Sequence, residues 1–170
     1  MQRIVILGNS GSGKSTLARR LGAKLGLPVV HLDRLFWEPG WTEPTTEAFR
    51  ARLAAAMPAD RWITEGNYVT RTFDMRLPYA DTIIVLETPR LLCMWRAFWR
   101  SVFAKPRPDL PEGCSEGLRS DLPEFMRQTW DYEQRRVRME AAIPKMAPEA
   151  KVVRLRTRGE AARFLRELAP

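Results

Sequence analysis

Short runs of apolar residues alternate along this chain with longer stretches in which apolar residues recur every three or four positions. The first pattern is typical of buried strands, and the second is typical of helices that pack one face against a sheet. We expect strands at residues 4–7, 29–32, 62–65, 82–87 and 152–155. Because helical patterns separate most of these runs, the alternation predicts an α/β domain with a parallel sheet.

The helical patterns cover residues 16–25, 46–57, 90–103, 122–142 and 160–168. Thr45 or Thr46 is expected to cap the second helix, and Asp121 and Glu124 form a capping box before the fourth. In 90–103 the spacing predicts a core-facing stripe of buried side chains rather than a ligand site. Its residues are Leu91, Leu92, Trp95, Phe98, Trp99 and Val102. No second core is visible, so we expect a single domain spanning residues 1–170.

The loop after the first predicted strand reads Gly8-Asn9-Ser10-Gly11-Ser12-Gly13-Lys14-Ser15 and is followed by Thr16. This matches the pattern of the phosphate-binding loop and lies between a strand and a helix, where that loop is found. Glycines let the backbone N–H groups approach phosphate oxygens, and the helix N-terminus adds a positive dipole. Lys14 is placed to reach the β- and γ-phosphates of ATP, and the Ser15 hydroxyl to bind Mg²⁺. A glycine-rich turn that binds nothing is the weaker alternative.

Length and composition narrow the class of protein and the compartment in which we expect it. The length of 170 residues suits one domain, and we find no apolar run long enough for a membrane span and no targeting segment. Two cysteines, Cys93 and Cys114, are too few for a disulfide framework, so we expect a reduced, cytoplasmic protein. The net charge of +8 comes mostly from arginine. It indicates either a solvated basic surface or arginines used to bind polyanions.

Three acidic residues end predicted strands, and ligands of parallel α/β sheets bind at that edge. Asp33 either orients an acceptor hydroxyl or caps a turn. Glu65 either holds a water of Mg²⁺ or caps the next helix. Glu87 is interpreted as structural. The single histidine, His31, is interpreted as a core residue whose side chain points to the same side as Asp33 if the strand continues.

Basic residues gather at one place, since Arg96 and Arg100 share a helix face and Arg107 follows in an irregular segment. A loop of that length inside a compact domain is usually functional. We therefore interpret residues 104–118 as a lid that closes over ATP, with Arg119 as a weaker contributor. Trp37, Trp41 and Tyr68 either line an acceptor pocket or stack on a base, or they form a small separate core.

With these residues placed, the chain resembles the adenylate-kinase-like kinases of the P-loop superfamily. More narrowly, it is similar to the bacterial DNA topology modulation (FlaR-like) proteins. The resemblance rests on His31-Leu32-Asp33, Trp37-Glu38-Pro39-Gly40-Trp41, Trp62-Ile63-Thr64-Glu65-Gly66-Asn67-Tyr68, residues 80–86, Arg107-Pro108-Asp109 and Glu112-Gly113-Cys114-Ser115-Glu116.

The resemblance implies a three-layer α/β/α P-loop NTPase fold with strand order 2-3-1-4-5, and ATP and Mg²⁺ as cofactors. It assigns residues 8–16 to phosphate binding and Arg96, Arg100 and Arg107 to the lid region. It places Arg156 to Glu160 beside the adenine. The chain has Glu65-Gly66-Asn67-Tyr68 where adenylate kinases have Asp-Gly-Phe/Tyr-Pro. AMP is therefore not implied as the acceptor, and Arg71 and Arg76 remain candidates for contacting one.

Three functions are compatible with these residues. The first is an ATP-dependent small-molecule kinase, with Asp33 acting on a nucleoside, a nucleotide or another hydroxyl compound. The second is a nucleotide-dependent regulator that affects DNA topology with little turnover. Direct nucleic-acid binding has no dedicated motif to support it. The third is a simple ATPase, which needs no acceptor pocket.

Overall fold

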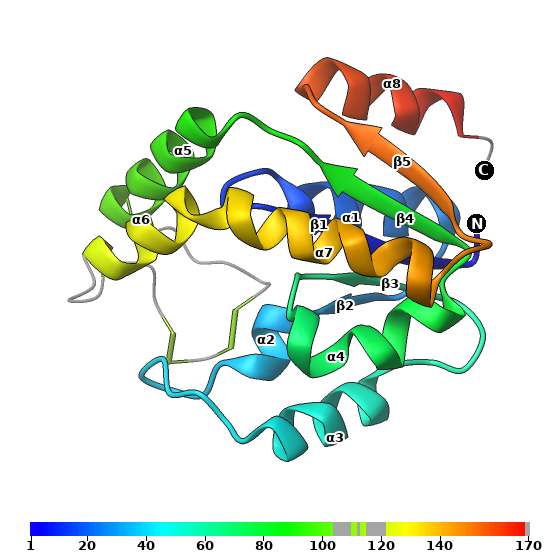
Figure 1. The fold of residues 1–170 in the computed structure, drawn as a ribbon, viewed down its shortest axis with the longest axis horizontal. Coiled ribbons are helices and arrows are strands. Elements are labelled where there is room, and N and C mark those ends of the chain that lie inside the picture. Colours follow the sequence, from blue (N-terminus) through cyan, green and yellow to red (C-terminus); the bar gives the residue numbers. More distant parts are fainter. Residues whose placement is uncertain (104–109, 112, 115–121, 169–170) are drawn as a thin grey trace.

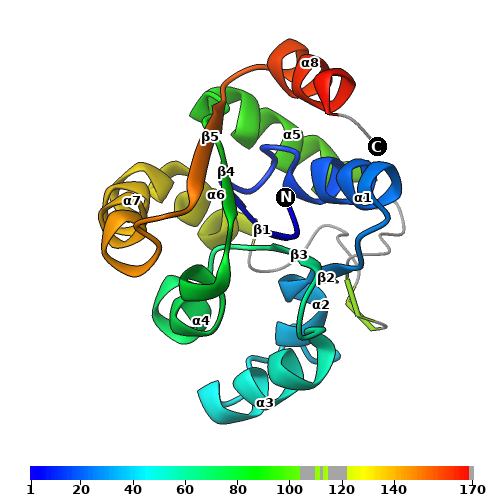
Figure 2. The ribbon, with the colours of Figure 1, turned by 90° about the vertical axis from the view of Figure 1, so that its right-hand side faces the viewer.

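A computed structural model of the chain describes residues 1–103, 110–111, 113–114 and 122–168. The five strands of this described part form one all-parallel sheet in the order β2-β3-β1-β4-β5. Helices cover both of its faces, which gives three layers (Figures 1 and 2). The expected fold class and strand order are confirmed. The elements are β1 (Arg3–Gly8), α1 (Lys14–Leu25), β2 (Val29–His31), α2 (Leu32–Phe36), α3 (Thr46–Ala56), β3 (Trp62–Glu65), α4 (Val69–Arg76), η1 (Leu77–Tyr79), β4 (Thr82–Leu86), α5 (Arg90–Phe103), α6 (Leu122–Trp130), α7 (Tyr132–Met146), β5 (Lys151–Leu155) and α8 (Arg158–Glu167).

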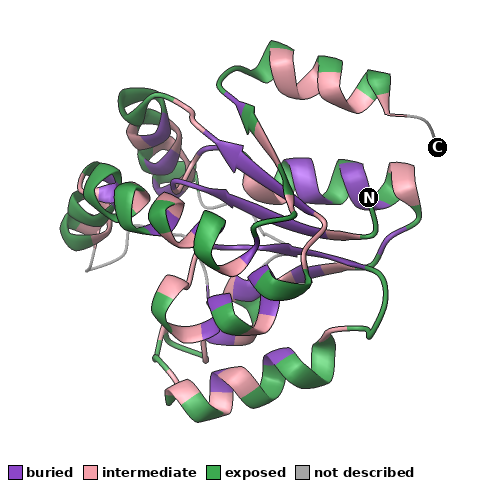
Figure 3. Ribbon diagram, turned by 45° about the vertical axis from the view of Figure 1, so that its right-hand side comes forward, coloured by how far each residue is buried: buried purple, intermediate pink, exposed green. Residues whose placement is uncertain are grey.

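The sheet is apolar on both faces, as a parallel sheet between two helical layers must be. In β1, Ile4 and Ile6 pack towards α1 and α8, whereas Val5 and Leu7 pack towards α4 and α7. Figure 3 shows the central strands of the sheet buried, whereas β5 at its edge is mostly half-buried or exposed. The phosphate loop therefore follows the central strand of the sheet, which is buried from Ile4 onwards and gives the loop a fixed base.

A third apolar cluster supports the edge of the sheet next to β2. It joins α2 and α3 through Phe36, Phe49 and Leu53, all of them buried. The α3 helix begins where the sequence predicts, because the Thr45 hydroxyl accepts a hydrogen bond of 3.2 Å from the Ala48 N–H. This cluster fixes the position of the residues that follow β2.

Two predicted element boundaries are wrong. The second strand ends at His31, and Asp33 lies in the first turn of α2, so these two side chains do not share a strand face. The helix expected over 122–142 is two helices, α6 and α7, separated at Asp131. Asp131 has φ −78° and ψ 1°, outside the helical region, and a short polar side chain that tolerates such a break. The predicted cap Asp121 lies outside the described residues.

The orientation predicted for the stripe on α5 is also wrong. The face that packs against the protein carries the small side chains Cys93, Ala97 and Ser101, while most of the predicted stripe is exposed. The reason is the close approach of α5 to the phosphate loop, where a Cβ on Gly11 would meet the Cys93 carbonyl oxygen at 2.4 Å. Within the described ranges, no helix has the length and apolar character to cross a bilayer.

Candidate active site

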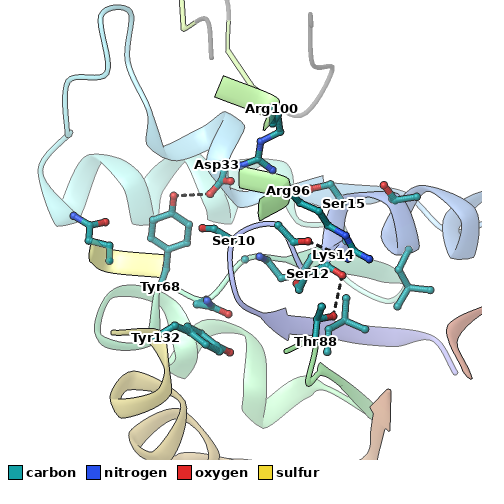
Figure 4. Close-up of a pocket in the computed structure, with 18 of the residues that line it drawn as sticks. Ser10, Ser12, Lys14, Ser15, Asp33, Tyr68, Thr88, Arg96, Arg100 and Tyr132 are labelled. Atoms are coloured by element: carbon teal, nitrogen blue, oxygen red, sulfur yellow. Dashed lines mark hydrogen bonds between the residues drawn. The ribbon is translucent and has the colours of Figure 1, made fainter. Parts of the chain in front are cut away.

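The loop from Gly8 to Ser15 leaves β1 and turns directly into α1, as the sequence predicts. Gly13 caps α1 in the left-handed conformation, with φ 100° and no side-chain acceptor. The N–H groups of the first helical turn are therefore available to an anion at the loop. The Lys14 ammonium lies against the loop (Figure 4), and it donates a hydrogen bond to the Asn9 carbonyl at 3.0 Å.

Side chains from later in the sequence hold the loop from outside. Asn67 bonds Gly8 twice, because its Oδ1 accepts from the Gly8 N–H at 3.1 Å and its Nδ2 donates to the Gly8 carbonyl at 2.9 Å. Three further hydrogen bonds join Asn9 to the carbonyl of Thr129 (2.9 Å), Arg96 to the carbonyl of Gly11 (3.3 Å) and Thr88 to the carbonyl of Ser12 (3.3 Å). Sequence reasoning missed the part played by Asn67, Thr88 and Thr129, although Asn67 stood within a quoted motif.

Arg76 in turn holds the segment that carries Asn67. Its guanidinium is fully buried and donates to the carbonyls of Gly66 at 3.1 Å and Asn67 at 2.7 Å. Burial lowers the pKa of Arg76 to about 9, while the nearby charge of Glu65 acts in the opposite direction. The group is still a cation at neutral pH. Arg76 is absent from the cleft wall, so its position favours a structural role over the acceptor contact considered for it.

One cleft of about 1510 Å³ joins the phosphate loop to the region beyond β2. Asp33 and Tyr68 lie in its wall, and the Tyr68 hydroxyl donates to Asp33 Oδ1 at 2.8 Å (Figure 4). Burial raises the pKa of Tyr68 well above its ordinary value, and the charge of Asp33 raises it further. The phenol therefore stays protonated and keeps one carboxylate oxygen of Asp33 occupied.

Tyr68 adopts a left-handed backbone conformation, with φ 38°, that is uncommon for a residue with a side chain. Its ring packs against Phe36 and Phe49, with centroids 4.7 and 4.9 Å away. These contacts and the hydrogen bond to Asp33 hold the strained residue in place. Such strain is often concentrated at functional sites.

Trp37 and Trp41 extend the same wall, with ring centroids 5.3 Å apart in an edge-to-face arrangement. Trp37 also packs on the third apolar cluster. The small separate core considered for these aromatics is therefore present and forms one side of the cleft, and their role in an acceptor pocket stays a prediction. Arg71 lies nearby and donates to Glu43 at 2.9 Å.

The other strand-end acids differ in their surroundings. Glu65 is buried, and its carboxylate is 2.8 Å from His31 Nδ1, so His31 is partnered as the sequence indicated, although its position is half-buried rather than fully in the core. Glu65 does not line the cleft, and a metal role for it stays a prediction. Glu87 pairs with Arg154 at 3.2 Å and with Arg156 at 3.0 Å, which agrees with its structural interpretation.

Arginines bring positive charge to the loop, and Arg96, Arg100 and Arg156 all line the cleft. Burial lowers the pKa of Arg96, and so does the adjacent charge of Arg158. Positive charges gathered in this way favour the binding of a polyanion such as a triphosphate. The predicted lid residue Arg107 and the weaker candidate Arg119 lie outside the described residues.

The residues present fit a magnesium ion bound together with a nucleotide. Ser15 lines the cleft at the start of α1, where its hydroxyl can serve as a hard oxygen ligand. No group of three or more potential ligands from His, Cys, Asp and Glu occurs in the described part of the chain. Mg²⁺ is commonly held by one or two protein groups, substrate phosphates and water, so such a group is not required.

No family model matches the chain, and no curated protein matches it by sequence. Solved structures do match its fold. The chain has the fold of the P-loop kinases. Shikimate kinase from Acinetobacter baumannii in complex with shikimate matches with a TM-score of 0.58 at 16% identity, over 98% of this chain and 90% of that one. Deoxyadenosine kinase from M. mycoides with bound dATP has a TM-score of 0.56 at 16% identity, over 97% and 98%.

A third P-loop kinase, a gluconokinase from Sinorhizobium meliloti, has a TM-score of 0.54 at 16% identity, over 98% of this chain and 88% of that one. The similarity spans nearly the whole chain in all three cases. At these identities it establishes a common fold. The narrower resemblance to FlaR-like proteins stays a prediction.

Proposed function

We propose that the protein is an ATP-dependent kinase that transfers the γ-phosphoryl group to a hydroxyl of a small, nucleoside- or nucleotide-like acceptor. One observation carries the proposal: the phosphate loop and the Asp33–Tyr68 pair line the same cleft. One end of this cleft suits a triphosphate, and the other offers a carboxylate among aromatic rings. The matching kinases support the proposal, since one contains shikimate and another contains dATP.

The chain's own residues account for the requirements of phosphoryl transfer, which are positioning and charge neutralisation. The amides of the loop and Lys14 bind the phosphates, and Ser15 contributes a ligand to Mg²⁺. Arg96 and Arg100 neutralise charge on the transferred group, and Arg107 joins them as a lid residue in this scheme. Asp33 accepts the proton of the acceptor hydroxyl while Tyr68 holds the carboxylate in orientation. Arg156 is assigned to the nucleotide, beside its base.

The size of the cleft favours transfer over simple hydrolysis. Small-molecule sites usually enclose about 300–1,000 Å³, and this cleft measures about 1510 Å³. It therefore has room for a nucleotide and a second substrate together. A water molecule, as the acceptor of an ATPase, would not need the aromatic wall of Trp37 and Trp41.

The test is ATP consumption with Mg²⁺ against a panel of nucleosides, nucleoside monophosphates and small hydroxyl metabolites. We expect at least one acceptor to raise the rate and the Lys14→Ala variant to lose it by about 10²-fold or more, since charge stabilisation of this kind is typically worth that much. Lys145→Ala removes an exposed lysine from α7 and serves as the matched control.

Asp33→Asn separates chemistry from binding in the same assay. We expect it to lower kcat while leaving the affinity for ATP unchanged. Acceptor-dependent transfer that survives in Lys14→Ala would contradict the proposal. ATP binding without any acceptor-dependent rate would favour a nucleotide-dependent regulator, and the salt dependence of DNA binding would then be measured.

A further inference from the structure

The α5 helix presents an apolar face to solvent along its whole length. Its exposed side chains include Leu91 at 69%, Trp95 at 59%, Phe98 at 41% and Phe103 at 63% of their full surface. The helix lies at one end of the molecule beside α6 (Figure 1). Larger exposed apolar patches on proteins usually mark a site of interaction.

The order of residues on this face is that of a helix-pairing seam. Leu91, Trp95, Phe98 and Val102 follow one another at spacings of four, three and four, as the a and d positions of a heptad do. No charged residue interrupts them, because Arg96 and Arg100 on the same helix line the cleft instead. A partner helix could therefore pack here without burying a charge.

The face is also preorganised. Trp95 contacts Trp99 with ring centroids 5.0 Å apart, and Trp99 stacks on Phe103 at 5.2 Å. Side chains that already restrain one another lose less rotamer entropy when a partner covers them. Aromatic residues ordered in this way are common at protein interfaces.

Two described residues of the segment between α5 and α6, Gly113 and Cys114, lie away from the exposed face of α5. Gly113 accepts a hydrogen bond from the Gly40 N–H, and the Cys114 thiol donates to the Glu38 carbonyl at 3.1 Å. These two residues therefore contact the loop after α2 rather than the seam. Residues 104–121 are also mainly polar, with Leu110 and Leu118 as their large apolar side chains.

The exposed area matches what a dimer needs. Aromatic side chains present about 150–250 Å² each, so the exposed parts of Trp95, Phe98 and Phe103 amount to roughly 250–400 Å² of apolar surface, to which Leu91 and Val102 add. A standard interface buries about 800 Å² on each partner, of which roughly 60% is apolar. The face supplies about that quantity without contributions from another element.

We propose that this face of α5 is the interface of a homodimer, in which it packs against the same face of a second copy. The same uncharged seam on both copies is self-complementary, as a two-fold interface requires. The proposal is independent of the kinase activity proposed above. It does place the interface on the helix that carries Arg96 and Arg100.

Sedimentation velocity of the full chain over a range of micromolar concentrations tests the proposal. The wild-type protein is expected to be a dimer. The double variant Leu91→Lys/Trp95→Lys is expected to be a monomer, with dimer affinity lowered at least 100-fold. Both side chains are exposed, so far-UV circular dichroism should be unchanged. Val137→Lys on α7, which is 64% exposed away from the seam, is the matched control and should remain a dimer.

If the double variant misfolds, the single variant Val102→Lys makes the same test within the seam. A wild-type protein that is monomeric at all concentrations overturns the proposal. A dimer that persists in a folded seam variant also overturns it, because the interface would lie elsewhere. A monomer whose seam binds vesicles of anionic phospholipid overturns it in favour of a membrane surface.

Discussion

The Asn67 side chain forms hydrogen bonds with the β1 backbone of the kind that a neighbouring strand forms, at a position just beyond the end of β3. Its side-chain amide exchanges two hydrogen bonds with the backbone of Gly8, the first residue of the phosphate loop. Arg76 donates hydrogen bonds to the carbonyls of two successive residues, Gly66 and Asn67. The geometry of the loop thus depends on an amide and a guanidinium that are distant from it in the sequence.

Removing this amide should weaken nucleotide binding without abolishing the fold. For Asn67→Ala we expect about tenfold lower affinity for a non-hydrolysable ATP analogue, since two neutral hydrogen bonds contribute roughly 1 kcal/mol each. Isothermal titration calorimetry measures the change directly. Gln134→Ala, which removes an exposed amide on α7, should leave the affinity unchanged. Equal affinity in Asn67→Ala and wild type would mean that the loop keeps its shape without Asn67.

Among the contacts between elements, that of the phosphate loop with α5 leaves the least room for a side chain in the loop. Gly11 has φ 75°, and a Cβ added there would meet backbone atoms of Cys93 at 2.4 to 3.2 Å. Backbone atoms cannot rotate away as a flexible side chain can. The two elements therefore pack at a distance that only a glycine in the loop allows.

Gly11→Ala should consequently displace α5 or distort the loop. We expect it to lower ATP-analogue affinity by more than tenfold and to reduce stability by more than the cost of a left-handed alanine. Gly26→Ala measures that cost alone, about 1–2 kcal/mol, because Gly26 has φ 62° with nothing within 4 Å of an added Cβ. Urea unfolding and calorimetry of both variants give the comparison. Indistinguishable results for the two would show that α5 moves aside without effect.

Sequence reasoning succeeded where neighbouring residues determine the outcome. Glycine spacing and the adjacent apolar run identify the phosphate loop, and Thr45 identifies the start of α3. It failed for α5 because a period of 3.6 residues defines a face but does not say which side meets the protein. A second, less conspicuous stripe on this helix consists of small side chains, and it is the buried one. Its residues are Cys93, Ala97 and Ser101.

In the candidate site, too, the residues of local motifs were predicted, whereas residues that act through long-range contacts were not. Lys14, Ser15, Asp33, Arg96 and Arg100 were predicted, and the structure places all of them along one cleft. The side chains that hold the phosphate loop in place were missed, because each contacts a residue far away in the sequence. The separation is 59 positions for Asn67, 76 for Thr88 and 120 for Thr129. Such long-range contacts leave no periodic signal in a single sequence.

At the scale of the whole molecule, Asp81 joins the beginnings of three adjacent strands. Its carboxylate accepts hydrogen bonds from the N–H groups of Gln2 and Arg3 at the start of β1, and its own carbonyl accepts one from the Lys151 N–H of β5. Burial raises the pKa of this carboxyl. Hydrogen bonds from Arg3, Thr82 and Gln2 outweigh burial, so the pKa lies below its ordinary value.

A lowered pKa in the folded state means that the ionised carboxylate stabilises the fold. This contribution is complete above the unfolded-state pKa of about 3.9 and is lost as pH falls through the lower folded-state value. We expect Asp81→Asn to cost about 1 kcal/mol at pH 7, and the difference from wild type to disappear at low pH. Urea unfolding from pH 7 to pH 2 measures it. The exposed variant Asp60→Asn is the control, and a difference that does not depend on pH would contradict the assignment.

The strand order also determines when the phosphate loop can be completed during synthesis on the ribosome. The loop follows the first strand, but that strand pairs with β3 and β4, and the side chains that hold the loop belong to residues 67, 88, 96 and 129. A nascent chain emerges from its N-terminus. The segment made first is therefore finished late, because its strand first gains a neighbour in the sheet when β3 has been made, and the loop gains its contact with Thr129 only when well over half of the protein has been translated.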